Sequence, residues 1–485
     1  MFETATRFSP RGWGPRKGML GGSKLGGTVL AAVVLALLAG CTTVSSTTSP
    51  GLSRAQQQLN VDAFDMVWET VRDRHYDPKL GGLDWEAVRE ELRPRVAQAR
   101  TMTDARALFE EALAHLAMSH FAIISGAVFS AVEDVPKENA GSTGLVVRVR
   151  DGQAMVTDVL PESPAAALEI HPGWVIRRIG SEDLAPVISA IETTYAGKAG
   201  EQMMLARAIV KRLRRPVGSN VEVEFAADAD RPVTLSVPCE APVGRTATFP
   251  GLPPMSVRLD ARQVNETIAY VGFNMFLDPL YVMPRFEEAV RANLEAVGFI
   301  IDLRGNPGGL GAMATGLAGW FVDTPNELLG TMRTRTYELR FIISPRGTTY
   351  DGPLAILVDG CSASTAEILA GGLKDIGRAR IFGSRTAGAA LPSLVQALPN
   401  GDAFQFAVAD YVSAGGRRLE GAGVIPDVEV IPTRDQLLAG EDPVLDAAVN
   451  WIRAQGQAGR GGVPRPAEAR NDTPEARLFP EEAAK

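Results

Sequence analysis

The segment "LVDGCSASTAEILAGGLKDIGRA", residues 357–379, places several hydroxyl side chains at the start of a predicted helix that follows an apolar strand. A serine at such a junction is exposed at the sheet edge, and the first amides of the helix point outward, where they can stabilise an oxyanion. Ser and Thr are also favoured helix caps, and Glu367 stands three residues after Ser364, the spacing of a capping box. The residues alone leave both interpretations of Ser364 open.

A glycine-rich turn, "DLRGNPGGLGA" over residues 302–312, is the second group with chemical potential. It follows the apolar strand "GFIID", and the unencumbered backbone of Gly308 and Gly309 can approach a substrate closely. The turn lacks the GxxxxGK[ST] pattern of a phosphate-binding loop. Glycine-rich turns are common, so the turn alone is weak evidence of a functional site.

Histidine is scarce, and the chain has no HExxH or paired CxxC spacing, so we expect no metal and no other cofactor. The four histidines are His75, His115, His120 and His171. The formal charge of −8 and the absence of a long basic run argue against nucleic acid as a partner. Cys239 and Cys361 lie far apart in the sequence and predict small buried side chains and no disulfide framework.

The N-terminus is predicted to be a targeting segment, residues 1–40, because basic residues precede an apolar run from Val29 to Ala39. That run is too short for a membrane span. The stretch "LLAGCTT" resembles the lipobox of bacterial lipoproteins, which implies a lipid on Cys41, a membrane anchor and a position on the periplasmic face of the envelope. Thr42 in place of aspartate favours the outer membrane. A plain signal peptide with an incidental cysteine is the alternative.

The remaining pattern predicts an α/β multidomain protein. A polar tether and a helical domain precede a region of short strands, which is followed by alternating apolar strands and helices and then by a tail rich in Pro, Gly and charge. The predicted boundaries are 41–58 for the tether, 59–128 for the helical domain, 129–240 for the β domain, 241–455 for the α/β core and 456–485 for a disordered tail.

The β domain resembles a PDZ domain at "SPAAALEIHPGWVIRRIG", although Glu169 and Trp174 replace the usual glycine and aspartate. Such domains bind a peptide C-terminus as an added strand, and backbone amides hold its carboxylate. The resemblance implies that Thr143, Gly144, Leu145 and Val146 form that loop. A small β domain without a ligand is the alternative.

Taken together, the helical region, the PDZ-like region, "GFIIDLRGNPGG", "ILVDGCSASTAEILAGGLKDIG" and "GAGVIPDVEV" resemble the C-terminal-processing (tail-specific) and tricorn-core serine peptidases over roughly residues 60–435. The resemblance implies a crotonase/ClpP-like core with Ser364 as the nucleophile. It also implies that the amides of Gly309 and Thr365 form the oxyanion hole.

One departure from this pattern concerns the general base. In the processing branch a lysine stands 25 positions after the serine, and here that position is Ala389. Lys374, the nearest lysine in sequence, is expected to be solvated in the body of the helix. The tricorn branch uses a histidine and a glutamate instead, and the matching positions are His120, after Ser119, and Glu420. A carboxylate that orients a histidine lets it take the serine proton.

Each of these residues has a simpler interpretation. His120 could be a hydrogen-bonded histidine at a helix end, and Glu420 could pair with Arg417 and Arg418. Glu367 is expected to support the fold. We therefore expect a lipid-anchored periplasmic serine endopeptidase that cleaves peptide or protein substrates, with Ser119 adding a hydrogen bond to the histidine network. The alternative is a catalytically silent peptidase fold that binds peptides or acts as a scaffold. The sequence leaves the oligomeric state open.

Overall fold

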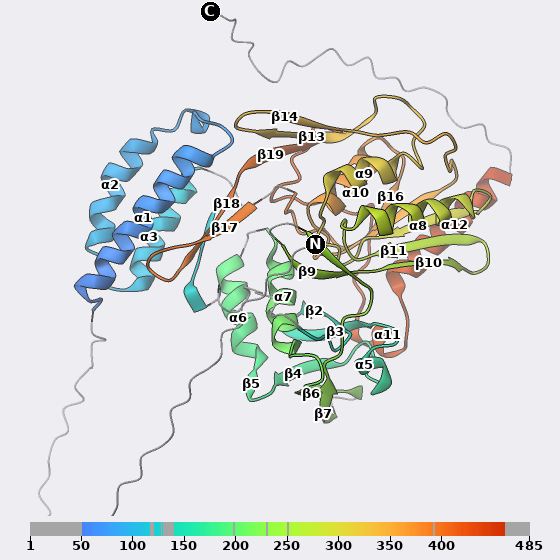
Figure 1. The fold of residues 1–485 in the computed structure, drawn as a ribbon, viewed down its shortest axis with the longest axis horizontal. Coiled ribbons are helices and arrows are strands. Elements are labelled where there is room, and N and C mark those ends of the chain that lie inside the picture. Colours follow the sequence, from blue (N-terminus) through green and yellow to red (C-terminus); the bar gives the residue numbers. More distant parts are fainter. Residues whose placement is uncertain are drawn as a thin grey trace, which may run out of the picture. The chain divides into compact units, whose positions relative to one another are not determined.

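The computed structural model describes residues 51–116, 121–127, 129, 140–196, 199–228, 231–249, 252–390 and 393–460. Cys41 and the predicted targeting segment lie outside these ranges, as do residues 461–485. None of the helices in the described part of the chain combines the length and the apolarity needed to cross a membrane. The mixed α/β class with a helical N-terminal region is confirmed (Figure 1).

The N-terminal region consists of three helices with a short 3₁₀ turn at Leu80–Gly82. They are α1 (Arg54–Arg74), α2 (Trp85–Ala97) and α3 (Met102–Ala114). The predicted apolar stripe of α1 is buried, with Phe64, Val67, Trp68 and Val71 all packed in the core. Thr101 and Asp104 form a capping box that fixes the start of α3.

The region predicted to be PDZ-like is an antiparallel sheet with the order β2-β3-β4-β6-β7, with β5 paired to β4. Its strands are β2 (Leu145–Arg150), β3 (Gln153–Val159), β4 (Val175–Ile179), β5 (Glu182–Asp183), β6 (Asn220–Ala226) and β7 (Pro232–Pro238). Its helices are α5 (Pro164–Ala167), α6 (Leu184–Tyr195) and α7 (Glu201–Leu213). The apolar side chains of α6 and α7 complete one core with this sheet.

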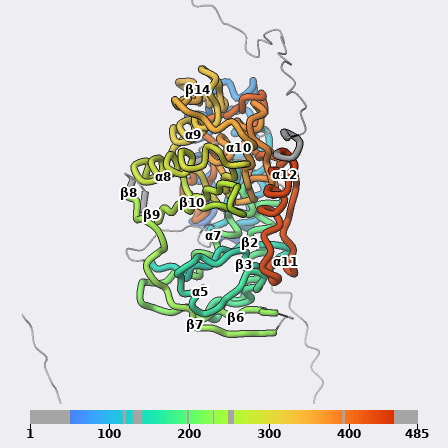
Figure 2. Tube along the Cα trace, turned by 90° about the vertical axis from the view of Figure 1, so that its right-hand side faces the viewer, coloured from blue at the N-terminus to red at the C-terminus, as the bar shows by residue number. Residues whose placement is uncertain are grey.

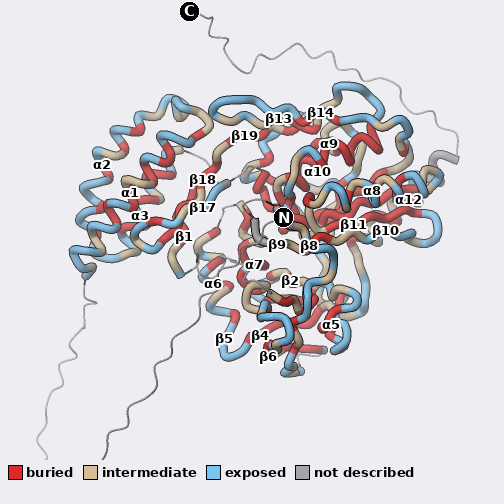
Figure 3. Tube along the Cα trace, viewed as in Figure 1, coloured by how far each residue is buried: buried red, intermediate tan, exposed pale blue. Residues whose placement is uncertain are grey.

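The α/β core contains a second sheet with the order β10-β11-β12-β15-β16-β20, parallel except at β10. Its strands are β10 (Leu259–Val264), β11 (Ile268–Phe273), β12 (Gly298–Asp302), β15 (Leu354–Val358), β16 (Arg380–Gly383) and β20 (Val428–Glu429). Every residue of β12 and β15 is buried, as expected for strands covered on both faces. In Figure 3 the chain around the neighbouring strand β11 is drawn mainly in red, the colour of buried residues.

Helices cover both faces of this sheet. They are α8 (Pro279–Arg291), α9 (Gly311–Ala318), α10 (Thr365–Asp375) and α12 (Pro443–Arg460). Ile300 and Leu357 pack with α12, whereas Ile301 and Ile356 belong to the larger core that includes α8 and α10. α12 continues to Arg460, five residues beyond the predicted end of the core at residue 455.

The short helix α11 (Arg434–Leu438) lies against the PDZ-like sheet (Figure 2). Arg434 donates hydrogen bonds to the carbonyls of Gly173 and Ala227. The C-terminal part of the core therefore contacts the PDZ-like region. The boundaries proposed from the sequence at residues 128 and 240 stay predictions.

Two small sheets and a hairpin complete the core. One sheet has the order β1-β18-β17 and consists of β1 (Ala122–Ile124), β18 (Ala403–Ala407) and β17 (Ser393–Ala397). The other has the order β14-β13-β19 and consists of β14 (Glu338–Ile342), β13 (Leu328–Thr334) and β19 (Ala409–Ser413). The hairpin is formed by β8 (Arg245–Phe249) and β9 (Leu252–Val257). Since β1 and β17 both run antiparallel to β18, they begin at the same end of their sheet.

Candidate active site

Ser364 lies where β15 leads into α10, and its backbone is strained. Its φ of 53° and ψ of −119° place a residue with a side chain in a region that favours glycine. Such strain costs about 1–3 kcal/mol and persists only where the surroundings hold it. The side chain is half-buried, whereas Ser362 is fully buried and its hydroxyl donates to the Leu303 carbonyl at 2.7 Å. The structure thus leaves Ser364, and not Ser362, available for chemistry.

The glycine-rich turn packs directly against Ser364. A Cβ added to Gly308 would lie 2.7 Å from the Ser364 Cβ and 2.8 Å from the Thr365 nitrogen. The Thr365 hydroxyl donates to the Gly309 carbonyl at 2.8 Å, and Phe276 exchanges backbone hydrogen bonds with the turn on its other side. The amides of Gly309 and Thr365, predicted from the family resemblance as oxyanion donors, therefore belong to two segments in direct contact.

Asn306 fixes this turn from inside. Its side chain is fully buried, donates to the Phe273 carbonyl and accepts from the Gly308 amide, both at 2.9 Å. Its own carbonyl accepts from the amide of Ala363, the residue before the serine, at 2.9 Å. One asparagine thus connects the turn to the nucleophile loop.

Glu367 anchors a second loop, residues 386–389, beside the serine. Its buried carboxylate accepts from the Ser364 amide at 3.0 Å, from the amides of Gly388 and Ala389 at 2.8 and 2.9 Å, and from the Thr386 hydroxyl at 2.5 Å. Burial raises the pKa of Glu367 to about 7, although these donors oppose the shift. The carboxylate holds the backbone around Ser364, in line with the expected supporting role.

Ala389 occupies the place where the processing branch is expected to carry lysine. Its carbonyl accepts the Ser364 amide at 3.0 Å, so the position is adjacent to the serine, but a methyl group supplies no base. The expectation that Lys374 is solvated is wrong, because its ammonium group donates to the Ile425 carbonyl at 2.6 Å and pairs with Asp427 at 2.8 Å. The nearby carboxylate of Asp427 and the Ile425 carbonyl explain the difference.

Glu420 belongs to a segment that lies against the 386–389 loop. The amide of the next residue, Gly421, donates to the Gly388 carbonyl at 2.8 Å, and both carboxylate oxygens of Glu420 are shielded from solvent. The neighbouring arginines have ion pairs elsewhere: Arg417 with Asp375, and Arg418 with Asp410 at 2.8 Å. These pairs disfavour the simple alternative in which Glu420 serves to neutralise the arginines.

Ser119 and His120 lie outside the described residues. The chain that follows them is fixed: Phe121 is buried between His75 and Phe404, at ring-centroid distances of 5.5 and 6.2 Å, and β1 begins at Ala122. His75 accepts the Asp77 amide at 3.0 Å, and burial lowers its pKa. His115 lies at the C-terminal end of α3, and the ring of His171 packs edge-on against Trp174.

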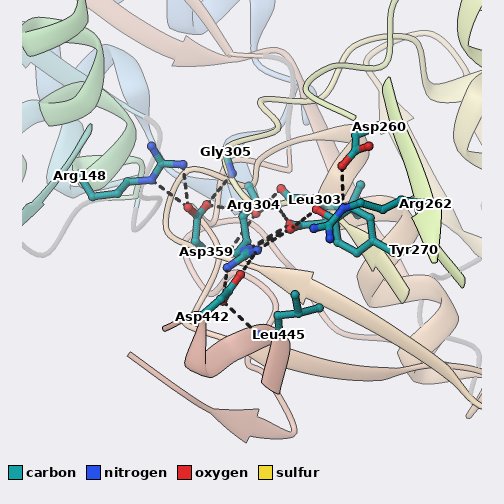
Figure 4. Close-up of polar contacts among 12 residues, drawn as sticks. Arg148, Asp260, Arg262, Tyr270, Leu303, Arg304, Gly305, Asp359, Asp442 and Leu445 are labelled. Carbon is teal, nitrogen blue, oxygen red and sulfur yellow. Dashed lines mark hydrogen bonds and ion pairs between the residues drawn. The ribbon is translucent and has the colours of Figure 1, made fainter. Parts of the chain in front are cut away.

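Arg148 and Asp359 form a buried ion pair that the sequence analysis missed (Figure 4). Arg148, on β2, donates to Asp359 at 2.8 Å, and Asp359 also accepts the amides of Gly305 and Cys361 at 2.8 and 3.0 Å. Burial alone would raise the pKa of Asp359, but the guanidinium and the amides outweigh it and lower the pKa. The pair joins the PDZ-like sheet to both the glycine turn and the nucleophile loop.

Arg304 forms a second buried cluster in the same view (Figure 4). It bridges Asp302, at 2.6 Å, and Asp442, the residue before α12, at 2.8 Å. Tyr270 completes the group by donating its hydroxyl to Asp302 at 2.9 Å. The cluster fastens α12 to the strand that leads into the glycine turn.

The predicted PDZ loop, Thr143–Val146, overlaps the first two residues of β2, which stands at the edge of the sheet. The amides of Gly144 and Leu145 donate to the hydroxyls of Ser142 and Thr143, at 3.2 and 3.5 Å. A peptide carboxylate that binds at Thr143–Val146 would have to replace these local bonds. Cys239 and Cys361 are both buried and free, as predicted, and burial raises the pKa of Cys361 to about 12.

Comparison with known proteins adds two family matches. The model of peptidase family S41 matches residues 267–430, and that of the tricorn protease C1 domain matches residues 61–114. The first match includes Gly309, Ser364 and Glu420. The second ends before Ser119, and neither reaches the segment from Thr143 to Val146.

Individual relatives agree with these matches. The chloroplastic carboxyl-terminal-processing peptidase 3 of Arabidopsis thaliana is 26% identical over 393 residues, which cover 78% of this chain and 70% of that protein. The putative tricorn protease homolog 2 of Streptomyces coelicolor is 24% identical and covers 80% of this chain but 32% of its own length. The crystal structure of mature CPAF has a similar fold, with a TM-score of 0.53 at 14% identity over 84% of this chain and 99% of that one.

Proposed function

We propose that this chain, whose residues 267–430 match peptidase family S41, is a serine endopeptidase in which Ser364, His120 and Glu420 form the catalytic triad. The observation that carries the proposal is the strained Ser364 held between the glycine turn and an alanine at the lysine position. A serine in this setting has oxyanion donors beside it but needs a base from another segment. Ser119 is proposed to add a hydrogen bond to the His120 network.

In the proposed reaction His120 acts first as a base and then as an acid. His120 takes the proton of Ser364 as the serine oxygen attacks the peptide carbonyl, and the amides of Gly309 and Thr365 stabilise the oxyanion. His120 then gives the proton to the leaving amine as the peptide bond breaks. Water repeats the sequence on the acyl-enzyme and releases the carboxylic acid. Glu420 holds the histidine tautomer and stabilises the imidazolium, and no metal or organic cofactor takes part.

The strand connections support a role for His120. β1 starts two residues after it, and β17 starts four residues after Ala389, whose carbonyl contacts the Ser364 amide. Both strands begin at the same end of β18, about 10 Å apart across two strand spacings. The chain that follows the proposed base therefore enters the same sheet as the chain that follows Ala389, two strands apart.

Fluorophosphonate labelling of the full-length protein in detergent tests the triad. We expect the wild type to label and Ser364→Ala to abolish labelling. His120→Ala should slow labelling by about 10³-fold or more, and Glu420→Gln should slow it by about 10-fold or more. Ser344→Ala, which changes an exposed serine, is the matched control. No labelling of the wild type would overturn the proposal and favour the silent scaffold. Equal labelling of His120→Ala would overturn the proposed triad. Labelling that survives Ser364→Ala would identify another serine.

The envelope location is a separate part of the proposal. It places a lipid on Cys41, which anchors the peptidase to the outer membrane on its periplasmic face, and assigns peptide C-termini to the loop Thr143–Val146. Its support is the lipobox-like sequence and the edge position of β2. Cys41→Ser should move the protein from the membrane to the soluble fraction. Retention in the membrane fraction would contradict the anchor.

A further inference from the structure

Thr386 uses both hydrogen-bonding capacities of its hydroxyl group between two segments of the site. The hydroxyl donates to Glu367 Oε1 at 2.5 Å and accepts the Val424 amide at 2.6 Å. The residue is buried, and its own amide also pairs with the Val424 carbonyl at 3.2 Å. Only a hydroxyl side chain can donate and accept at the same point.

Glu367 extends this connection to the serine. Oε1 accepts the Thr386 hydroxyl and the Gly388 amide, whereas Oε2 accepts the amides of Ser364 and Ala389. The side chain is fully buried, so water cannot replace a partner that moves away. The continuous path of hydrogen bonds runs from the Ser364 amide through Glu367 and Thr386 to the Val424 amide.

The backbones along this path are in close contact. A Cβ on Gly423 would lie 2.7 Å from the Thr386 carbonyl oxygen, and one on Gly388 would lie 3.1 Å from the Gly421 carbonyl carbon. Gly421 directly follows Glu420. A displacement of the 386–389 loop would therefore move the Glu420 segment relative to Ser364.

We propose that Thr386 is a positioning residue that, through Glu367, fixes the segment carrying Glu420 relative to the backbone of Ser364. The inference rests on the proposed function, because it requires Ser364 and Glu420 to act in one site. Thr386 itself touches neither substrate nor reacting atoms. Its effect is geometric, and small displacements of catalytic groups cost up to about 10²-fold in rate.

Three variants separate the hydroxyl from the volume of the side chain. Thr386→Val keeps the shape and removes the hydroxyl, Thr386→Ala removes both, and Thr386→Ser keeps the hydroxyl. We expect kcat per phosphonate-titrated site to fall about 10- to 100-fold in the valine and alanine variants with KM nearly unchanged, and to stay within about 3-fold of wild type in the serine variant. Titration counts only assembled sites, so a loss of folded protein does not imitate the effect.

Thr315→Val provides the matched control, because Thr315 donates one hydroxyl hydrogen bond within α9 at 2.9 Å. Its kcat should equal that of wild type. Equal kcat in Thr386→Val and Thr386→Ser would overturn the positioning role.

Amide hydrogen exchange measures the strength of the same hydrogen bonds and requires no turnover. The amides of residues 388, 389 and 424 should exchange about 5-fold or more faster in Thr386→Val than in Thr386→Ser, as expected from the loss of about 1 kcal/mol per hydrogen bond. Unchanged exchange rates would overturn the positioning role of the Thr386 hydrogen bonds even if the enzyme is active. Failure of the wild type to label overturns the proposed function instead, so the two failures are distinguishable.

Discussion

Two buried carboxylates near the nucleophile show opposite electrostatics. Asp359 faces the Arg148 guanidinium, and its pKa is lowered, whereas Glu367 faces only neutral donors, and burial raises its pKa to about 7. Both side chains accept backbone amides of the nucleophile region. The difference shows that amide donors alone do not offset the desolvation of a buried carboxylate, whereas one added cation does.

The two networks also connect different parts of the chain. The ion pairs of Arg148 and Arg304 join residues that are far apart in sequence, from β2 to the nucleophile loop and from the glycine turn to α12. The Glu367 network joins segments that all line the proposed site. We infer that the first network fixes the architecture and the second fixes the local geometry.

Breaking the larger ion cluster should have the largest effect on stability. Arg304→Met removes the cation from Asp302, which is buried, and from Asp442, whose side chain is 37% exposed, so we expect a loss of about 2–4 kcal/mol of unfolding free energy. Urea unfolding measures it. Arg95→Met, which removes an exposed pair with Glu111, is the control and should cost clearly less. A loss below about 1 kcal/mol for Arg304→Met would refute the architectural role.

The pH dependence of Glu367 should come next. Its folded pKa of about 7 lies above its usual value of 4.5, so the native state keeps a proton that the unfolded chain releases. The resulting stabilisation is complete below pH 4.5 and is lost as the pH rises to about 7, by about 3 kcal/mol in all. The difference in unfolding free energy between wild type and Glu367→Gln should therefore change by that amount between pH 4.5 and pH 8. A pH-independent difference would show that the carboxylate is ionised throughout.

The sequence predicted the helices and strands better than the side-chain contacts that join them. The apolar runs 299–301 and 354–358 predicted buried strands, and the structure confirms both, because a doubly covered strand needs apolar residues at every position. The family resemblance selected Ser364, which the structure places at the predicted junction of strand and helix. The strain at Ser364 was not predictable, since it arises from tertiary contacts of a residue type that carries no such preference.

The Arg148–Asp359 pair was missed for a related reason. Arg148 is one of several arginines in an alternating strand, and nothing local distinguishes it from a solvated residue. Its role appears only when β2 lies against the nucleophile loop, 211 positions away in sequence. The hydrogen-bonding role of the Thr386 hydroxyl could not be predicted from the sequence for the same reason, because nothing local distinguishes a buried threonine from a solvated one in a polar loop.

A double-mutant cycle on Arg148 and Asp359 should give a smaller, intermediate effect. Arg148→Met and Asp359→Asn each leave one buried partner, whereas the double variant leaves neither charge, so we expect a coupling energy of about 2 kcal/mol. Thermal or urea unfolding of the four proteins gives the value. Additive losses would mean that the amides of Gly305 and Cys361, and not the arginine, hold Asp359.

The smallest effect should come from Lys374, the lysine nearest to Ser364 in sequence. Its ammonium group already contacts the Ile425 carbonyl and Asp427, and the two side chains of the pair are 17% and 31% exposed. Lys374→Met should therefore cost about 1 kcal/mol of unfolding free energy and leave phosphonate labelling of Ser364 unchanged. Lys374→Arg is the matched variant that keeps the charge. If Lys374→Met folds but labels more than about 10-fold more slowly, a lysine acts as the base after all. The contrast between a site held by amides and a frame held by charges would then fail, because a residue of the ion-paired frame would act in the site as a neutral amine.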